Sequence, residues 1–287
     1  MANVRNVRII TDVTAQLEPE LIEQYQITVL PVQIRFGDET FQIGDRDDGW
    51  RFFERMMEGP AESSSATIPG QLFQETYARL SRETEQILVI VASSQLSGAY
   101  ERARAAARAF LGRCRIAVVD SMSASWGLGL LVEAAAKAAG QGLPLDDVVR
   151  LVRGVMPHIY LVFLVERLDY LERGGRLGQA QALLGTMLRI KPILLVEDGE
   201  IVSMEKVRTR EAALEKLTDF VAEFAVIDQV VILKSPVESK INELIGTLRE
   251  QLSLSLPEHR FPSINYDPIL ACHLGPEALG IIVYEGI

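Results

Sequence analysis

The feature that most limits the possible folds is an unbroken apolar run of strand length, Ile87–Ala92. A strand that is apolar at every position is typically buried on both faces, as in a parallel sheet covered by helices. A Ser-Ser-Gln-Leu-Ser-Gly turn at 93–98 follows the run, and Ala99–Leu111, rich in Ala and Arg, is predicted to be a helix. This order of strand, turn and helix predicts an α/β fold.

Two further strand–helix units flank this one. Their strands are predicted at Val7–Asp12 and Arg115–Asp120. Between the first two units, Thr28–Phe36 is predicted to be one strand and Gly59–Gly70 a loop. Three successive units imply right-handed crossovers, so we expect a parallel-sheet, three-layer α/β domain over residues 1–154.

The second half of the chain has a different pattern. Strands and helices no longer alternate regularly, which predicts a smaller mixed-sheet α/β domain over residues 155–287. The expected elements are a helix with a Gly-Gly break at Arg167–Leu188, a hairpin at Lys191–Lys206, a helix at Thr209–Phe224, and short strands at Ile269–His273 and Ile281–Tyr284.

Charge and hydropathy exclude several classes of protein. The chain has 29 Lys and Arg against 39 Asp and Glu, a net charge of −10, which argues against a nucleic-acid partner. Its apolar runs are shorter than the roughly 20 residues of a membrane span, so no integral membrane segment is expected. No apolar signal core precedes the first strand, which indicates a cytoplasmic protein. Cys114 and Cys272 are too far apart in sequence to predict a metal site.

The carboxyl ends of the predicted parallel strands carry polar residues. Ligands of such sheets bind at this edge, where Thr11-Asp12, Ser93-Ser94 and Asp120-Ser121 are expected. Hydroxyls and free amides at the start of the helix after Ser93-Ser94 would bind an anion. Alternatively, Ser97 caps the helix and the other serines fill a turn. The pattern leaves both interpretations open.

Covalent catalysis is the competing functional hypothesis. Ser93 or Ser94 could act with His273 as a hydrolase or phosphotransferase, but the chain lacks a Gly-x-Ser-x-Gly motif. Cys272 and His273 would point to opposite faces if both lie in a strand. The segment Arg173-Gly174-Gly175-Arg176 fits either a phosphate nest or, better, a helix C-cap.

Read together, several segments resemble the DegV family of bacterial fatty-acid-binding proteins. The matching segments occur in the family's order and span nearly the whole chain. They are Thr11-Asp12-Val13-Thr14-Ala15, Ser93 to Tyr100, Val119-Asp120-Ser121, Leu171 to Gly178, Ile190 to Leu194, Lys206 to Thr209 and His273-Leu274-Gly275-Pro276. Val13 and Glu277 depart from the family's pattern.

The resemblance implies two α/β domains, with an acyl chain in a buried tunnel that the C-terminal domain closes and a carboxylate held by hydroxyls. One hydroxyl would come from Ser93 or Ser94. Another would come from the segment 64–69, where Ser64, Ser65 and Thr67 replace the family's Thr-Ser-Gln-Pro order, and either Ser64 or Ser65 takes the threonine position. Arg208 and His273 match basic positions at the carboxylate mouth, for ligand or partner contact.

The function implied by the resemblance is that of a carrier without catalytic residues. It would bind a long-chain fatty acid, such as palmitate, and present the carboxylate to a separate ATP-dependent fatty acid kinase, in the service of phospholipid synthesis. The chain itself has no Gly-x4-Gly-Lys-Ser/Thr motif for a nucleotide, and neither a cofactor nor a metal is expected.

Overall fold

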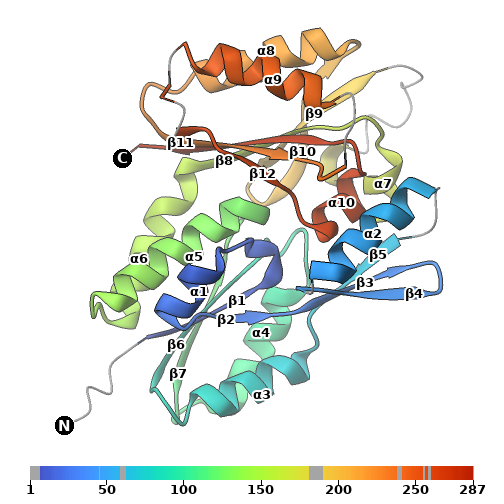
Figure 1. The fold of residues 1–287 in the computed structure, drawn as a ribbon. Coiled ribbons are helices and arrows are strands. Elements are labelled where there is room, and N and C mark those ends of the chain that lie inside the picture. The colour runs from blue at the N-terminus through green and yellow to red at the C-terminus, as the bar shows by residue number, and fades with distance from the viewer. Residues whose placement is uncertain are drawn as a thin grey trace. The chain divides into compact units, whose positions relative to one another are not determined.

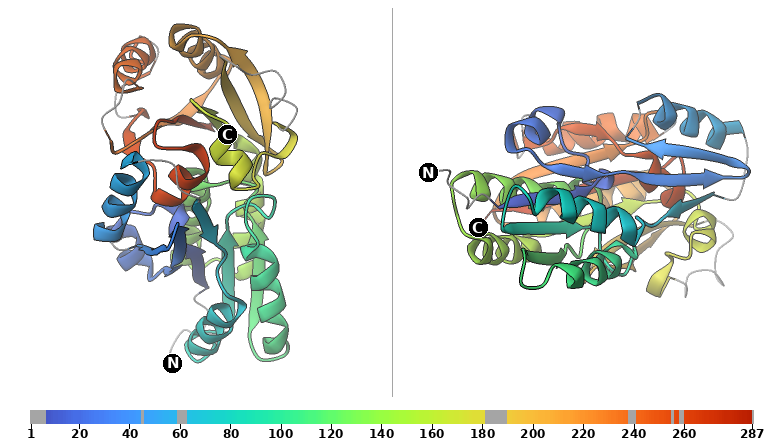
Figure 2. Two further views of the ribbon diagram at one scale, coloured as in Figure 1. Left: turned by 90° about the vertical axis from the view of Figure 1, so that its right-hand side faces the viewer. Right: turned by 90° about the horizontal axis from the view of Figure 1, so that it is seen from below.

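The computed structural model describes residues 7–44, 46–58, 63–180, 190–237, 241–254, 256–257 and 260–286. The chain forms two compact units, Met1–Gln33 with Ala66–Pro157, and Ile34–Ser65 with His158–Ile287. This division differs from consecutive domains at 1–154 and 155–287, because residues 34–65 belong to the second unit and make it the longer one. Figures 1 and 2 show the strands and helices of both units.

The first unit contains the predicted parallel sheet. Its strands lie in the order β2 (Thr28–Leu30), β1 (Arg8–Asp12), β6 (Gln86–Val91) and β7 (Arg115–Asp120). Helices α3 (Gly70–Leu80) and α4 (Ala99–Ala107) cover one face, and α1 (Pro19–Tyr25), α5 (Ser125–Gly140) and α6 (Leu145–Val155) cover the other (Figure 1). Strand β6 is buried from Ile87 onwards, as its apolar run predicts. The three-layer α/β prediction is confirmed.

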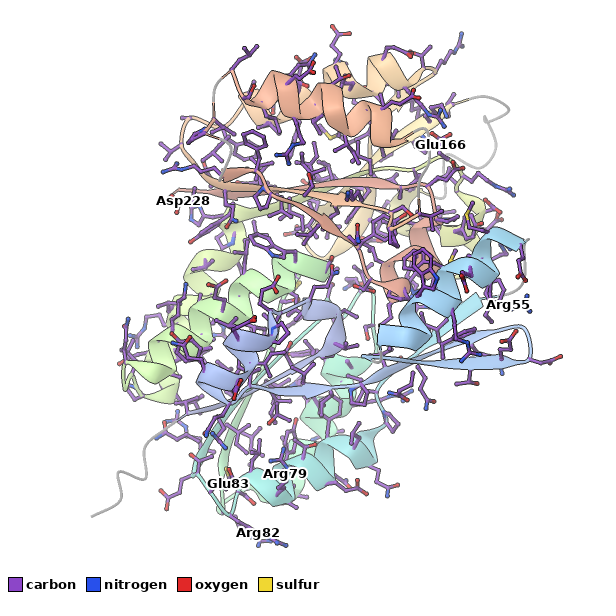
Figure 3. All side chains as sticks on the ribbon, viewed as in Figure 1. Arg55, Arg79, Arg82, Glu83, Glu166 and Asp228 are labelled. Atoms are coloured by element: carbon purple, nitrogen blue, oxygen red, sulfur yellow. The ribbon has the colours of Figure 1, made fainter. Side chains whose placement is uncertain are left out.

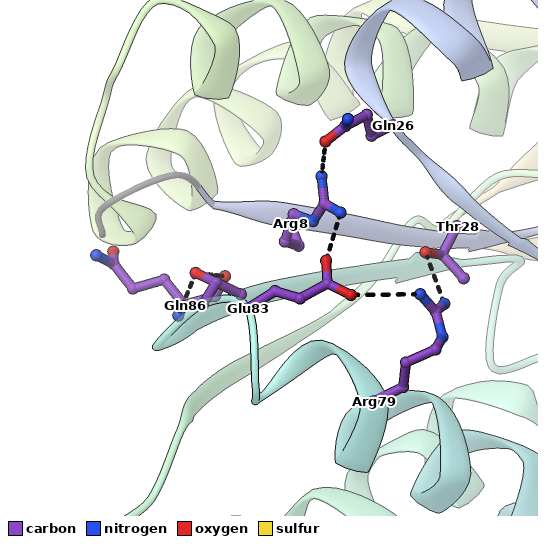
Figure 4. Close-up of polar contacts among 7 residues, drawn as sticks. Arg8, Gln26, Thr28, Arg79, Glu83 and Gln86 are labelled. Carbon is purple, nitrogen blue, oxygen red and sulfur yellow. Dashed lines mark hydrogen bonds and ion pairs between the residues drawn. The ribbon is translucent and has the colours of Figure 1, made fainter. Parts of the chain in front are cut away.

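A polar network closes the amino-terminal end of this sheet (Figure 4). Arg8 donates to the Glu83 carboxylate at 2.6 Å and also to Gln26. Arg79 donates to the Thr28 hydroxyl at 3.4 Å and approaches Glu83 at 3.9 Å. Since these side chains pair with one another, the groups that could contact a ligand are expected at the opposite, carboxyl end of the strands.

Pro31 divides the predicted strand Thr28–Phe36 in two. It follows β2, and the chain then enters β3 (Val32–Phe36) of a different sheet, because proline has no N–H to continue the first ladder. That three-stranded sheet has the order β4 (Glu39–Ile43), β3, β5 (Ser63–Ala66). The loop prediction for Gly59–Gly70 is therefore wrong at β5, and residues 59–62 lie outside the described residues.

The second unit has a six-stranded mixed sheet. Its order is β10 (Glu200–Val207), β9 (Lys191–Glu197), β8 (Ile159–Leu164), β13 (Leu279–Glu285), β11 (Ile227–Lys234) and β12 (Ser263–Asn265), antiparallel except for the β11–β12 pair. Helices α8 (Arg210–Ala222) and α9 (Ile241–Leu252) pack on it with the unit's apolar core. Asp198 and Gly199 both have positive φ, as the predicted hairpin turn requires.

The predicted strand Ile269–His273 is wrong, because this segment is helix α10 (Pro268–Leu274). Asp267 caps it by accepting from the amides of Ile269 at 2.7 Å and Leu270 at 2.9 Å, and Pro268 occupies the first turn. Helix α2 (Arg46–Glu58) packs nearby, with the Phe53 and Tyr266 rings 6.1 Å apart. Within the range Arg167–Leu188, α7 (Asp169–Arg173) is helical, while 181–189 lie outside the described residues.

None of the helices in the described parts of the chain combines the length and the apolar character needed to cross a bilayer.

Candidate functional site

The Ser93–Gly98 turn joins β6 to α4 in the first unit. Ser93 is fully buried, and its hydroxyl accepts from the Gln95 amide at 3.2 Å. Its carbonyl accepts from the amides of Leu96 at 3.0 Å and Ser97 at 2.8 Å. Ser93 is therefore part of the scaffold of the turn, whereas the side chain of Ser94 is only half-buried.

The Asp120 carboxylate accepts hydrogen bonds from backbone amides that the sequence pattern predicted to be free. It accepts from the Ser94 amide at 3.1 and 3.2 Å and from the Met122 amide at 3.1 Å. The Ser97 hydroxyl accepts from the Ala99 amide at 3.3 Å, close to the capping role in the alternative interpretation. The prediction of free amides is thus wrong for Ser94 to Ser97 and for Ala99, because internal acceptors satisfy them. A ligand carboxylate would meet hydroxyls here.

A second carboxylate, Asp12, lies at the same end of the sheet. It is buried, and it accepts from the Thr14 amide at 3.0 Å, from the Thr14 hydroxyl and from the Ala92 amide at 3.3 Å. Burial raises the Asp12 pKa above its ordinary value, although these hydrogen bonds oppose the shift. The first unit therefore has two carboxylates at the end of the sheet that carries its serine turn.

Thr67 lies against the end of this turn. A Cβ added to Gly98 would come within 3.3 Å of Thr67 Cγ2, so the glycine allows the close approach. Arg102 extends toward the carbonyls of Thr67 and Ile68, at 3.5 Å each. The structure thus brings Thr67 to the serine turn, as a shared binding role requires.

Ser65 and His273 meet in the second unit. Ser65 comes from β5 and His273 from α10, and Ser65 Oγ lies 2.9 Å from His273 Nε2. The side chain of Ser64 lies outside the part that the structure describes. The sequence predicted both residues for the site but had no means to pair them.

Burial makes His273 a weak base. Its Nδ1 is buried and has no hydrogen-bond partner within the described ranges. Desolvation, followed by the charge of Arg176, lowers the pKa of His273 to about 4. The imidazole is therefore neutral at pH 7, with Ser65 as its polar contact.

The Gly-Gly segment next to His273 is a helix cap. The Arg176 amide donates to the Leu171 carbonyl and the Gly175 amide to the Glu172 carbonyl, both at 3.0 Å. With Gly175 at φ 65°, this is a Schellman motif that ends α7. The cap interpretation of this segment is confirmed.

The cap also determines what surrounds the imidazole. A Cβ on Gly174 would come within 2.6 Å of His273 Nδ1, so only glycine fits there without a shift. Arg176 donates back to the Gly174 carbonyl, which holds the guanidinium in this part of the unit. The motif thus links Arg176 to the ring whose pKa it lowers.

Arg208 lies between β10 and α8 and is exposed. Its neighbour Thr209 caps α8 by accepting from the Ala212 amide at 3.1 Å, which fixes the start of the helix. Within the described residues, no hydrogen bond or ion pair joins Arg208 to Ser65 or His273. The role of Arg208 at the carboxylate mouth therefore stays a prediction.

A charged cluster missed by sequence reasoning lies just after β8. Glu166, labelled in Figure 3, contacts Lys191 and accepts from Arg210 Nε at 2.9 Å. Burial alone would raise the Glu166 pKa, but the hydrogen bonds from Lys191 and Arg210 and their charges hold it below its ordinary value. Lys191 lies in the Ile-Lys-Pro segment and Arg210 follows the Arg-Thr segment, so the motifs gave a signal, although Glu166 lies in neither.

The sequence profile of the DegV family, a family of uncharacterised proteins, matches residues 6–286. The chain belongs to the DegV family. A DegV domain-containing protein of Caldanaerobacter subterraneus subsp. tengcongensis is 30% identical over 286 residues, which cover 98% of this chain and 100% of that protein.

Solved DegV structures are similar over nearly the whole chain. One is described as showing fatty acid binding of a DegV family protein from Thermus thermophilus, with 27% identity, a TM-score of 0.86 and coverage of 98% and 100% of the two chains. Another is DegV from Bacillus subtilis, described as a fatty acid binding protein, with 26% identity, a TM-score of 0.83 and the same coverage. These likenesses agree with the α/β fold and with the resemblance found in the motifs.

Proposed function

We propose that this DegV-family protein is a non-catalytic carrier of a long-chain fatty acid, such as palmitate. In this role it buries the acyl chain and presents the carboxylate to a separate ATP-dependent fatty acid kinase, which forms the acyl-phosphate. The similarity to the fatty-acid-binding DegV proteins of Thermus thermophilus and Bacillus subtilis supports the ligand class. The kinase step rests on the resemblance of the motifs.

The observation that carries the proposal is the contact between Ser65 and a neutral His273. If Nε2 donates its proton to Ser65, the unpartnered Nδ1 is a bare lone pair. The Ser65 proton is then available to a ligand carboxylate. A hydroxyl that is oriented in this way stabilises the anion without placing a fixed charge beside it.

The serine turn of the first unit also offers a hydroxyl that could bind a carboxylate. We assign it to Ser94 rather than Ser93, because the Ser93 side chain is fully buried and already holds the Gln95 amide. Thr67 lies beside the same turn and is kept as a candidate, as is Ser64. Arg208, exposed and permanently charged, suits contact with the kinase or with the phosphorylated product.

The acyl chain would supply most of the affinity. Burying about fourteen methylenes at ~0.8 kcal/mol each contributes roughly 11 kcal/mol before the costs of binding are subtracted. The loss of one hydroxyl bond to the carboxylate should therefore weaken binding without abolishing it.

The test is a titration of delipidated protein with palmitate, with Ser65→Ala compared with Ser253→Ala. Ser253 is the matched control, since its hydroxyl donates to the Glu250 carbonyl on an exposed helix end. We expect Ser65→Ala to weaken binding by about 1–3 kcal/mol and Ser253→Ala to leave it unchanged. Equal affinities for palmitate in the two variants would contradict the assignment of Ser65, and a wild-type protein that takes up no fatty acid would overturn the proposal.

The kinase step has its own test. Arg208→Ala should retain palmitate but lose acyl-phosphate formation when a fatty acid kinase and ATP are supplied, because the change removes an exposed cation and no buried group. Wild-type turnover in this variant would contradict the role of Arg208.

Hydrolysis by Ser93 or Ser94 with His273 is less well supported. His273 Nε2 contacts Ser65 instead, and among the described residues nothing orients the ring through Nδ1, as a catalytic triad would. A base with a pKa of about 4 is also poorly matched to proton abstraction at pH 7. Turnover of a p-nitrophenyl ester by wild type but not by Ser94→Ala would favour the hydrolase.

A further inference from the structure

A groove in the first unit lies away from the carboxyl ends of its strands. Its volume is about 750 Å³, and it is formed by the second half of α4, by the 3-10 turn Arg108–Phe110 and by the first half of β7. Neither the serine turn nor the Ser65–His273 pair contributes to it. The groove therefore requires an explanation other than the proposed fatty-acid site.

The groove is rich in arginine although the chain has a net charge of −10. Four arginines and two glutamates line it: Arg104, Arg108, Arg113, Arg115, Glu85 and Glu101. Arg104 lies 3.8 Å from Glu101, and Arg115 pairs with Asp146 outside the groove. Arg108 and Arg113 are exposed, and the described residues supply neither with an ion pair. The groove thus has a local excess of positive charge, which its two glutamates only partly balance.

The wall of the groove that β7 forms is the edge of the sheet. In the described part of the unit, β7 pairs with β6 alone. The amides of Arg115 and Ser121 donate to Glu85 and Val91 carbonyls on the β6 side, six positions apart. Backbone groups alternate along a strand, so the N–H and C=O groups of Ile116 and Val118 point outward, into the groove that these residues line.

This edge lacks the usual protection against pairing. The register with β6 is uninterrupted, and Ile-Ala-Val-Val at 116–119 contains neither a charge nor a proline. Leu111, 81% exposed, adds an apolar contact at the same groove. An edge that offers unpaired backbone groups, apolar side chains and arginines is complementary to an extended strand in which acidic and apolar residues alternate.

We propose that this groove binds an extended acidic segment of another protein, which adds to β7 as a fifth strand of the sheet. A second copy of this chain fits less well through its own β7. The only acidic residue in β7 is Asp120, which already accepts from the amides of Ser94 and Met122. Self-pairing of β7 would therefore bring the arginines no free carboxylate.

The test uses a fluorescein-labelled peptide of alternating Glu and Val, followed by fluorescence anisotropy at low ionic strength. We expect Arg108→Glu/Arg113→Glu to weaken binding by about tenfold or more, because the two unpaired cations are reversed. Arg150→Glu/Arg153→Glu is the matched control, since it reverses two exposed arginines of α6 outside the groove and should bind as wild type does.

Two further measurements separate strand addition from attraction of charge alone. Val118→Pro removes one outward N–H, leaves the β6 ladder intact and should weaken binding of the peptide about as much as the arginine pair does. The same peptide with alternate N-methylated amides should bind about tenfold more weakly than the unmodified one.

The proposal fails if wild type does not bind the peptide, if the control pair weakens binding as much as Arg108→Glu/Arg113→Glu, or if N-methylation changes nothing. A wild-type dimer that Val118→Pro dissociates would show that a second copy occupies the edge, and would also overturn it. Palmitate uptake, measured in the same preparations, reports on the fold and on the proposed carrier function separately.

Discussion

The serine turn of the first unit and the Ser65–His273 pair of the second unit present hydroxyls in contrasting surroundings. Two carboxylates hold the backbone here through hydrogen bonds: Asp120 at the Ser94 amide of the turn, and Asp12 at the Ala92 amide just before it. Among the described residues no carboxylate supports the Ser65–His273 pair, and its imidazole is neutral because it is buried near Arg176. Hydrogen bonding therefore maintains the turn, and desolvation maintains the pair, so the two should fail under different perturbations.

The largest expected effect is the response of the pair to acid. His273 has a pKa of about 4 when folded and an ordinary value of 6.5, so the unfolded chain binds more protons between these values. The contribution of neutral His273 to the free energy of unfolding is at most about 3 kcal/mol. It should be fully present above about pH 6.5 and be lost as the pH falls toward 4. Urea unfolding at pH 7 and pH 4.5 measures this loss.

The control is His273→Gln, which cannot titrate but can still donate to Ser65. The difference in unfolding free energy between wild type and His273→Gln should depend on pH below 6.5 and be flat above it. A constant difference across the range would show that His273 does not carry the effect.

Removing the Asp120 carboxylate should destabilise the serine turn and leave the Ser65–His273 pair unchanged. Asp120→Ala leaves the amides of Ser94 and Met122 without their acceptor and should cost about 2 kcal/mol of unfolding free energy. Asp120→Asn keeps one acceptor oxygen and should cost less. Hydrogen exchange would show faster exchange at the Ser94 amide in Asp120→Ala, and unchanged exchange there would contradict the role given to Asp120.

Substitutions of the adjacent residues Ser93 and Ser94 should distinguish a structural role from a role in ligand binding. Ser93→Ala removes the acceptor for the Gln95 amide and should cost about 1 kcal/mol of stability. Ser94→Ala should leave stability nearly unchanged and weaken palmitate binding instead. Thermal unfolding and palmitate titration of both variants provide the comparison, and the reverse pattern would exchange the two roles.

The smallest effect concerns the approach of Thr67 to the turn. Gly98→Ala places a methyl 3.3 Å from Thr67 Cγ2 and should cost about 0.5 kcal/mol, since Thr67 must yield slightly. Gly70→Ala, where nothing lies within 4 Å, is the matched control and should not destabilise. Equal melting temperatures in the two variants would show that the contact is not tight.

The parallel sheet could be predicted because its signals are local. The buried run of β6 and the helix after it identify the strand and its layer without knowledge of distant residues. Pro31 also gave a signal, and reading Thr28–Phe36 as one strand ignored the amide that proline lacks. The same holds for Asp267-Pro268, because a capping aspartate followed by proline indicates the start of a helix and not of a strand.

Pairings over long sequence separations could not be predicted. Ser65 and His273 are both motif residues, but nothing local indicates that β5 brings one to the other. Similarly, Ser94 and Asp120 were both expected at the strand ends, yet the capture of the Ser94 amide by the carboxylate depends on the register of β6 and β7. The residue types at the site were therefore predictable, and their donor and acceptor roles were not.

The glycine that faces the imidazole has a consequence for sequence variation. Because a methyl at 174 would collide with His273 Nδ1, positions 174 and 273 are not free to vary independently. Among relatives that keep histidine at the second position, glycine should be fixed at the first. Wherever the histidine is replaced by a smaller residue, alanine or serine should begin to appear at 174, so the two columns of an alignment should covary although they are almost a hundred positions apart.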